Sequence, residues 1–547
     1  MRWARVLPVT PLLGGVLGAI LFLATLGPAI VRPTNLGWLM RHDTQTYLLA
    51  WHHFRREPWQ WPPGKILGVG YPVTTSIGNT DAVPLVAFPL KPLHAWLPDP
   101  GQYLGAWLLA CFVLQAVLGY RLLRRFVPDA RLAWLGAVFF LAAPAWIFRL
   151  GGHFALFGQW VVLAALCLYF APRFAPGRWI ALLCAAALIH FYLLVMAGAL
   201  WLADLWQRRA SLVHVLPGAA STLAVMWAAG YFVLGGAASA LPGFGTYRMN
   251  LLAPLDADGL WSRVLPDLPS AYGEFEGFNY FGLGMLLLAP LALLKRAPVD
   301  RARVMPLAVA ALLLAVLALS IRVALGSIEL FSYELPGVLR PYADLLRGSG
   351  RLFWPMYYLA FLAILVTVLR RFTPRVALGA CALALGVQIA DSSAALARAG
   401  ERLSRAAWSS PLKSAVWEEI GARYRRVLHV LPPPPSSAHA TFLPWAAFAA
   451  DHGMAINSGY FARVDAERAI EASQALEAAV RANTLDADSL YVFENEALWR
   501  LASARRGPED LVAEIDGYRV IAPGWRDASA GSPARSAGSP PARSRTR

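Results

Sequence analysis

The sequence predicts a polytopic α-helical membrane protein with about eleven transmembrane helices and a C-terminal extracytoplasmic α/β domain. Hydrophobic residues make up 57% of the 547 residues and charged residues only 15%, and the mean hydropathy is +0.48. This composition is too apolar for an ordinary soluble protein. Several apolar runs also reach the roughly 20 residues that a helix needs to cross a hydrocarbon layer. From residue 392 onward, shorter apolar runs alternate with polar residues, which is typical of strands.

The first apolar run covers residues 11–31 and follows Arg2 and Arg5. A cleaved signal peptide is the competing interpretation. The run has no convincing cleavage site of small residues, and more spans follow, so an uncleaved helix is favoured. The further expected spans are residues 104–121, 132–148, 156–171, 178–206 (two helices broken at Ile189-His190-Phe191), 212–236, 279–294, 304–323, 352–370 and 376–391.

The basic residues predict the orientation of these spans, because Lys and Arg collect in short cytoplasmic loops. If residues 32–103 lie outside, only Asp129, Asp204 and Asp300 oppose the basic residues of the inner loops. Those basic residues are Arg121, Arg124, Arg125, Arg131, Arg173, Arg178, Arg208, Arg209, Lys295, Arg296, Arg301, Arg303, Arg370, Arg371 and Arg375. With Arg2 and Arg5 included, topology thus accounts for most of the net charge of +16, and the basic tail adds a small part; no nucleic-acid partner is expected. We expect a multi-pass protein of the bacterial inner (cytoplasmic) membrane, with a cytoplasmic N-terminus and a periplasmic C-terminal domain.

The chain divides into three parts. Residues 1–391 form the transmembrane domain, which includes a first periplasmic loop at 32–103 with amphipathic helices and a short interfacial or re-entrant helix at 82–96. Residues 392–526 form the α/β domain, with strands expected at 426–431, 489–493 and 518–521 and helices at 466–482 and 508–515. Residues 527–547 repeat Ser-Pro-Ala-Arg and predict a disordered basic tail.

The expected spans contain almost no ionisable side chains, and His190 is the main exception. A lone histidine of this kind is interpreted as a satisfied core residue. A transporter usually places polar groups at the midplane of the membrane, so their scarcity argues against a transporter or flippase for a lipid-linked glycan. An inverted repeat would revive that alternative. A non-catalytic membrane scaffold, whose outer domain binds a partner, is the other alternative.

Asp43 follows the first span closely, so its carboxylate is expected near the membrane surface. A carboxylate there can take a proton from a sugar hydroxyl as that hydroxyl attacks an activated sugar. The alternative is that Asp43 caps a helix over residues 44–54, since Asp is a favoured N-cap residue. Asp81 precedes an apolar helix and has the same two interpretations.

A set of motifs extends over most of the chain. They are His42-Asp43 and residues 59–64, 80–85, 97–103, 149–153, 279–284 and 349–355. With the long first loop, the many spans and the C-terminal α/β domain, they resemble the C-type (GT-C superfamily) integral membrane glycosyltransferases, and in particular an incompletely characterised bacterial branch. The expected architecture of the transmembrane domain is therefore GT-C-like.

The resemblance implies a reaction. Such enzymes take a sugar from a polyprenyl-phosphate carrier and give it to an acceptor on the outer face, generally with inversion. Here the acceptor would be a cell-envelope glycan or lipid. The resemblance implies Asp43 as the general base and Asp81 as the second candidate, with Glu274 and Glu276 as further acidic residues. Related enzymes sometimes use a divalent metal such as Mg²⁺ or Mn²⁺, but no residue pattern here assigns one.

The leaving phosphate requires a positive charge, and a guanidinium suits this role. Arg351 is the first candidate, because the segment from Arg347 to Arg351 opens a span from the outer side. Its glycines would let backbone N–H groups approach an anion. The alternative is that Arg351 only snorkels at the interface. Arg149 and His153 are expected on the same side, as further contacts or as an anchoring pair, and His42 and Arg347 complete the set.

Overall fold

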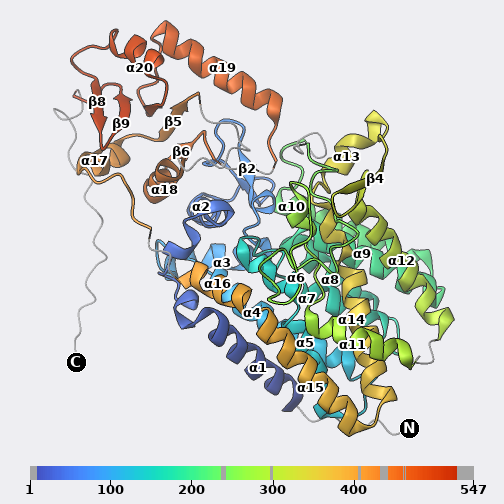
Figure 1. Ribbon diagram of the computed structural model, residues 1–547. Coiled ribbons are helices and arrows are strands. Elements are labelled where there is room, and N and C mark those ends of the chain that lie inside the picture. The colour runs from blue at the N-terminus through green and yellow to red at the C-terminus, as the bar shows by residue number, and fades with distance from the viewer. Residues whose placement is uncertain are drawn as a thin grey trace, which may run out of the picture.

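The computed structural model describes residues 9–526 except for 236–241, 296–299, 405–407, 432–441, 460 and 462. Arg2, Arg5, Arg296 and the expected tail at 527–547 therefore lie outside the described residues. The described chain forms twenty α-helices and nine β-strands. Figure 1 shows most of the helices gathered in one bundle, with a small sheet domain at one end of it.

Four helical segments in the described part of the chain are long and apolar enough to cross a membrane. They are α4 (Leu104–Leu123), α12 (Arg301–Leu319), the segment Ser349–Arg371 and α15 (Pro374–Asp391). The third consists of the 3₁₀ helix η10 (Ser349–Phe353) and α14 (Trp354–Arg371). A fifth span exists if α5 (Ala130–Leu141) and the next segment, Pro144–Gly151, are counted together despite a bend of 45°.

The expectation of about eleven spans is therefore not supported. Several of the other apolar runs form helices of only 10–17 residues. These are Leu12–Leu26 within α1 (Val9–Leu26), α7 (Trp160–Tyr169), α8 (Pro176–Ile189), α10 (Val215–Ala229) and α11 (Leu283–Leu294). A helix of about 12 residues measures about 18 Å, which is shorter than the hydrocarbon layer. Backbone breaks limit two of these helices, since α8 ends before His190, whose backbone is extended, and α11 begins after Gly282, whose φ is 87°.

The expected break in residues 178–206 is present. Helix α8 ends at Ile189, His190 has an extended backbone, and α9 (Phe191–Arg208) follows. The first loop contains α2 (His42–Arg56), α3 (Pro84–Leu90) and the 3₁₀ helix η4 (Lys91–Trp96), and strand β1 (Lys65–Ile66) pairs antiparallel with β2 (Thr75–Ser76). The remaining elements of the bundle and its loops are α6 (Pro144–Ile147), β3 (Arg322–Leu325), β4 (Ile328–Ser332), α13 (Arg340–Asp344) and α16 (Ser393–Ser404).

The C-terminal domain contains one five-stranded mixed sheet in the order β6-β5-β7-β9-β8. Strand β5 is parallel to β6 and β7, whereas β9 is antiparallel to β7 and β8. Its strands are β5 (Arg426–Val430), β6 (Ala455–Ile456), β7 (Ser489–Phe493), β8 (Leu511–Ile515) and β9 (Tyr518–Ala522). Its helices are α17 (Val416–Arg423), α18 (Leu443–His452), α19 (Ala466–Ala482) and α20 (Glu496–Ser503). The strands expected at 426–431, 489–493 and 518–521 and the helix expected at 466–482 are thus present.

The helix expected at 508–515 is wrong, because this segment contains β8. Strand β8 forms a hairpin with β9 through Asp516 and Gly517, whose φ angles are 50° and 81°. Two positive φ values are typical of the tight turn that joins antiparallel strands, and Asp-Gly is a preferred sequence for it. The dipeptide was the sequence signal for a hairpin here.

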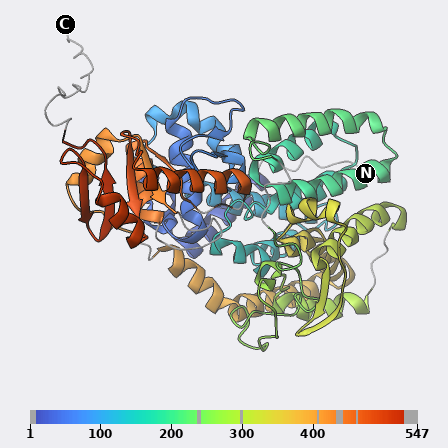
Figure 2. The same ribbon diagram turned by 90° about the horizontal axis from the view of Figure 1, so that it is seen from above.

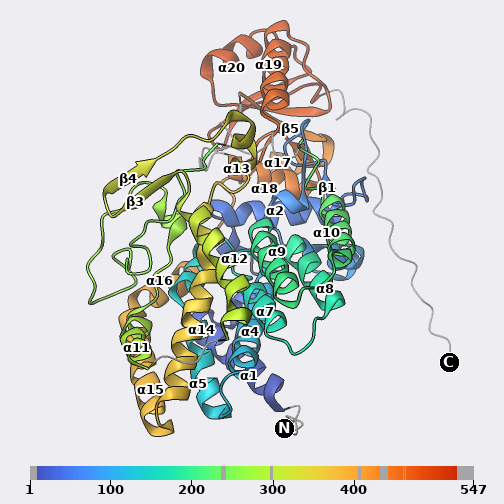
Figure 3. The same ribbon diagram turned by 90° about the vertical axis from the view of Figure 1, so that its right-hand side faces the viewer.

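The C-terminal domain docks on the first loop. Val69 pairs with Ile456 of β6 as a parallel bridge. The Ile456 N–H donates to the Gly68 carbonyl at 2.8 Å, and the Tyr71 N–H donates to the Ile456 carbonyl at 2.9 Å. Helix α18 also packs against α2. Figures 2 and 3 show the sheet domain beside the first loop, at one end of the bundle. Residues far apart in the sequence therefore meet at this end.

Candidate functional site

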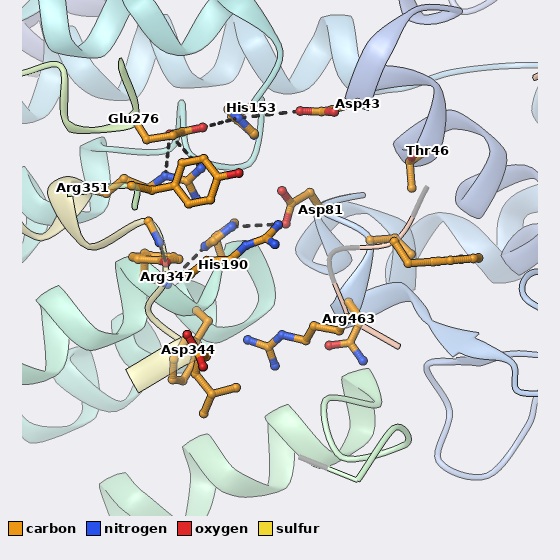
Figure 4. A pocket seen from close by; sticks show the side chains of 18 of the residues that line it. Asp43, Thr46, Asp81, His153, His190, Glu276, Asp344, Arg347, Arg351 and Arg463 are labelled. Atoms are coloured by element: carbon orange, nitrogen blue, oxygen red, sulfur yellow. Dashed lines mark hydrogen bonds and ion pairs between the residues drawn. The ribbon is translucent and has the colours of Figure 1, made fainter. Parts of the chain in front are cut away.

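A cavity of about 380 Å³ lies where the first loop, the helical bundle and the C-terminal domain meet. Its wall includes the start of α2, the turn before α3, the start of α9, the 3₁₀ helix η8 (Glu274–Gly277) and η10. The sequence-predicted residues that line it are Asp43, Asp81, His153, Glu276, Arg347 and Arg351. Figure 4 shows these side chains converging from separate elements.

Asp43 lies in the first turn of α2, where the helix dipole favours a negative charge. Arg41 occupies the N-cap position and the helix has no side-chain cap, so Asp43 does not cap it. The Asp43 Oδ2 is 3.7 Å from the His153 Nε2, and its side chain is 33% exposed. Asp43 therefore faces the cavity with room for a ligand. The side chain of His42 lies outside the described residues.

Glu276 holds three basic groups together. Its Oε2 accepts from the Arg149 Nη1 at 2.6 Å and from the Arg351 Nε at 2.9 Å. Its Oε1 is 3.0 Å from the His153 Nε2. Burial opposes the charged carboxylate, but the charges of Arg351, His153 and Arg149 outweigh it and hold the pKa of Glu276 well below its usual value. Glu276 is therefore ionised and fixes Arg351 and His153 in place.

Two glycines allow this contact. Gly350 and Gly277 touch so closely that a Cβ on Gly350 would overlap the Gly277 Cα. The Asn279 Nδ2 spans the junction by donating to the Gly277 carbonyl at 2.9 Å and to the Gly350 carbonyl at 3.0 Å. Close packing of η8 on η10 thus sets Arg351 beside Glu276.

The sequence suggested that the glycines between Arg347 and Arg351 present free N–H groups to an anion. In the structure the N–H groups of Gly348 and Gly350 already have partners. The Gly348 N–H donates to the Tyr192 hydroxyl at 2.7 Å. The Gly350 N–H donates to the Tyr247 carbonyl at 3.2 Å. Both groups are satisfied inside the protein, so these two N–H groups are not available to a bound anion.

Asp81 forms a pair with His190. The Asp81 Oδ1 is 3.2 Å from the His190 Nε2. The His190 Nδ1 accepts the Tyr192 N–H at 3.1 Å, so a neutral ring carries its proton on Nε2 and donates it to Asp81. His190 is therefore buried with both ring nitrogens satisfied, as the sequence suggested, and it also caps α9 and lines the cavity.

The backbone of Asp81 is in the left-handed region, with φ 55°. Such backbone strain in a non-glycine residue is concentrated at functional sites. The N-cap of α3 is Val83, so Asp81 does not cap that helix. Burial opposes its ionisation, but the charge and hydrogen bond of His190, with His153 and Arg351, lower the pKa of Asp81 to about 2. Asp81 therefore stays ionised and accepts protons only weakly.

Three arginines supply the positive wall of the cavity. Arg351 is paired with Glu276, and its guanidinium lies 5.1 Å from the centroid of the Tyr192 ring. Arg347 and Arg463 form no ion pair with a carboxylate among the residues that the structure describes, and both line the cavity. Their charges are available to a bound anion.

Arg463 is a residue that sequence reasoning missed. It lies in the C-terminal domain, just before α19, and its guanidinium is 5.8 Å from the centroid of the Phe191 ring. No motif marks it, because only the docking of the two domains brings it to the cavity. Asp344 also lines the cavity, where its Oδ1 accepts from the N–H groups of Gly243 and Phe244.

Two predicted residues do not line the cavity. Glu274 is buried elsewhere, where it accepts from the Arg248 Nε at 2.8 Å and the Asn250 Nδ2 at 2.9 Å. Arg149 is fully buried behind Glu276, with its guanidinium 5.3 Å from the Trp354 ring. Within the described parts of the chain, no group of three or more His, Cys, Asp or Glu side chains is arranged to hold a metal ion.

A family model described as "Domain of unknown function (DUF6311)" matches residues 15–393, and a second, "DUF6311 C-terminal domain", matches residues 416–523. No curated protein matches the chain. Both matched segments contribute to the cavity, since Asp43 belongs to the first and Arg463 to the second.

Proposed function

The chain belongs to the DUF6311 family, and because that family has no assigned function, we propose one from the cavity. In this proposal the protein is a membrane glycosyltransferase. It moves a sugar from a polyprenyl-phosphate carrier to a cell-envelope glycan or lipid acceptor on the periplasmic side of the bacterial inner membrane. The carrying observation is a single cavity that sets Asp43 and Asp81 opposite Arg347, Arg351 and Arg463.

The position of the cavity relative to the spans supports a substrate with a membrane anchor. Arg351 lines the cavity and lies near the start of the segment Ser349–Arg371, whereas Arg370 and Arg371 lie at its end. A helix of 23 residues is about 34 Å long. Arg370 and Arg371 thus lie at the end of the segment opposite the cavity. The tendency of basic residues to collect in cytoplasmic loops would place that end in the cytoplasm. A polyprenyl chain in the membrane can therefore present its phosphate to the cavity.

The proposed reaction is an inverting transfer. The acceptor hydroxyl attacks the anomeric carbon of the carried sugar as its proton passes to the Asp43 carboxylate. The bond from the anomeric carbon to the phosphate oxygen breaks, and its electron pair leaves on polyprenyl phosphate. Arg347 and Arg351 stabilise the charge that develops on this oxygen. The products are the glycosylated acceptor, polyprenyl phosphate and a proton on Asp43.

Asp43 suits the role of base better than Asp81. A general base works best when its pKa lies near the operating pH, and the pKa of Asp81 is lowered to about 2. Asp81 is instead held by His190, which suits binding of a hydroxyl or orientation of the sugar. His153, which lies between Asp43 and Glu276, links the base to the arginine side of the cavity.

The test is replacement of Asp43 by Asn in a strain that lacks the chromosomal copy. We expect transfer of labelled sugar from the polyprenyl-linked pool to envelope material to be lost, while the amount of protein in the membrane is unchanged. Removal of a general base costs about 10²–10⁴-fold in rate. The matched control is Asp267→Asn, at an exposed position outside the cavity. Full transfer by the Asp43 variant would exclude Asp43 as the base.

A further inference from the structure

A second cavity of about 540 Å³ adjoins the first and shares Phe461 and Arg463 with it. One wall is residues 70–74 of the first loop, and the other is the C-terminal domain. The α19 residues that line it are Ala466, Ala469, Ile470, Ala472, Ser473, Ala475 and Leu476. This second cavity, which we term the α19 groove, has no residue of η8 or η10 among the described residues that line it.

The lining of the α19 groove is nearly all apolar or small. Arg463 is the one charged residue among the described residues that line it. Ile470 is 58% exposed, which is unusual for isoleucine. The Asn457 side chain bonds both backbone groups of His429 and offers little to a ligand. A polysaccharide needs many polar partners, and this groove does not provide them.

One polar group in the groove lacks a partner. The Ser458 side chain is 3% exposed, lines the groove, and its Oγ forms no hydrogen bond in the described structure. A buried hydroxyl without a partner costs free energy, and Ser458 forms part of the groove wall. Ser458 directly follows β6 and Asn457, at the carboxyl end of parallel strands, where open α/β sheets bind ligands.

We infer that the α19 groove binds the apolar chain of an anionic amphiphile, with the acidic group of that molecule at Arg463. This inference rests on the proposed function and names its acceptor as a lipid. The donor chain belongs with the membrane spans near Arg351, whereas the groove lies beyond the cavity in the C-terminal domain. A lipid acceptor seated there would direct its polar head, and the hydroxyl that reacts, toward Asp43.

The experiment uses the full chain in nanodiscs and two photoreactive probes. One probe is decyl phosphate with a diazirine at the end of its chain, and the other is the matched diazirine decanol. Mass spectrometry then maps the labelled peptides. We expect the phosphate probe to label the α19 peptide that contains residues 469–476. The variant Arg463→Gln should weaken this labelling about tenfold or more, as loss of a charge-assisted hydrogen bond implies, without changing the labelling by decanol.

A tryptophan series tests the groove itself. Ala469→Trp fills the groove and should abolish labelling of α19, because an indole occupies the space of the chain. Ala478→Trp is the matched control, since Ala478 is an exposed residue of the same helix outside the groove. Equal labelling of the two tryptophan variants, or labelling of the bundle alone, would overturn the inference.

The variant Asp43→Asn separates the two proposals. It should keep the labelling of α19 because it leaves the groove intact. Labelling of α19 without any sugar transfer by the wild-type protein would remove the proposed function and keep the amphiphile site. Sugar transfer without labelling of α19 would support the proposed function and contradict the inference that the α19 groove binds an amphiphile.

Discussion

Glu276 shows how one buried carboxylate organises a site. It is 6% exposed and contacts Arg149, Arg351 and His153, which come from two separate segments of the chain. Ionised groups are rarely buried this deeply unless they are paired. Each of the three partners depends on Glu276 for its position, so the consequences of losing its charge extend across the cavity.

Replacement of Glu276 by Gln should destabilise the protein. It leaves Arg149, which is fully buried, without its counter-charge, and removing one partner of a buried pair costs about 3–5 kcal/mol. The free energy of unfolding should fall by this amount, measured from thermal unfolding of purified protein. The control is Glu477→Gln, whose exposed pair with Arg481 contributes less than about 1 kcal/mol. Equal effects of the two substitutions would contradict the central role of Glu276.

The Asp81 carboxylate predicts a pH dependence of stability. Its pKa in the folded protein is about 2, below the ordinary value of 3.8, so the folded state binds its proton less readily than the unfolded chain. Its contribution to stability is therefore present above about pH 4 and is lost as the pH falls toward 2. The difference in melting temperature between wild type and Asp81→Asn should be largest above pH 4 and should shrink below it. A constant difference from pH 7 to pH 2.5 would contradict this assignment.

At the residue scale, the sequence predicted six residues of the cavity wall, because motifs and membrane-proximal position mark polar residues in outer loops. It did not predict Arg463, whose place depends on contacts between domains. It also misjudged Glu274, since the two carboxylates of the Glu-Phe-Glu segment are chemically alike in sequence. Only the packing of η8 directs Glu276 to the cavity and Glu274 to Arg248.

At the scale of elements, the contact of η8 with η10 is the one that shapes the site. Neither segment has a strong helical pattern, and both depend on glycine for their close approach. The Asn279 side chain fixes the spacing of η8 and η10, because it donates to the carbonyls of both Gly277 and Gly350. Any side chain inserted between them would separate Arg351 from Glu276.

The substitution Gly350→Ala tests this arrangement. Its Cβ would overlap the Gly277 Cα, and overpacking of this kind costs about 1–3 kcal/mol. We expect a lower melting temperature together with reduced sugar transfer. Gly379→Ala in α15 is the control, because no atom lies within 4 Å of its added Cβ. The interpretation fails if the two variants behave alike.

Helix lengths were harder to predict than helix positions. The 3.6-residue pattern gave residues 466–482 as a helix, and α19 has these bounds. Hydropathy instead gave about eleven spans, because the mean hydropathy of an apolar run does not show where a helix within that run begins or ends. Helix α8 stops at His190, and α11 starts only after Gly282, which packs against the Gln388 side chain. Composition alone therefore predicts more spans than the helix lengths in the described chain support.

At the scale of the whole molecule, the proposed orientation can be tested with reporter fusions. Alkaline phosphatase needs disulfides and is active only in the oxidising periplasm. Fusions after residue 100 and after residue 404 should be active, and a fusion after residue 125 should be inactive. Fluorescent-protein fusions at the same three positions should give the reverse pattern. Phosphatase activity after residue 125 without activity after residue 404 would invert the orientation.

The bridge between Val69 and Ile456 has a consequence for assembly. Strand β6 has only two residues and lies at the edge of the sheet, and residues of the first loop cover this edge through backbone hydrogen bonds. An uncovered edge is a template for pairing with other chains. The first loop is synthesised long before the C-terminal domain, so it is already in place when β6 emerges. Without the first loop, the C-terminal domain would expose this edge to pairing with other chains.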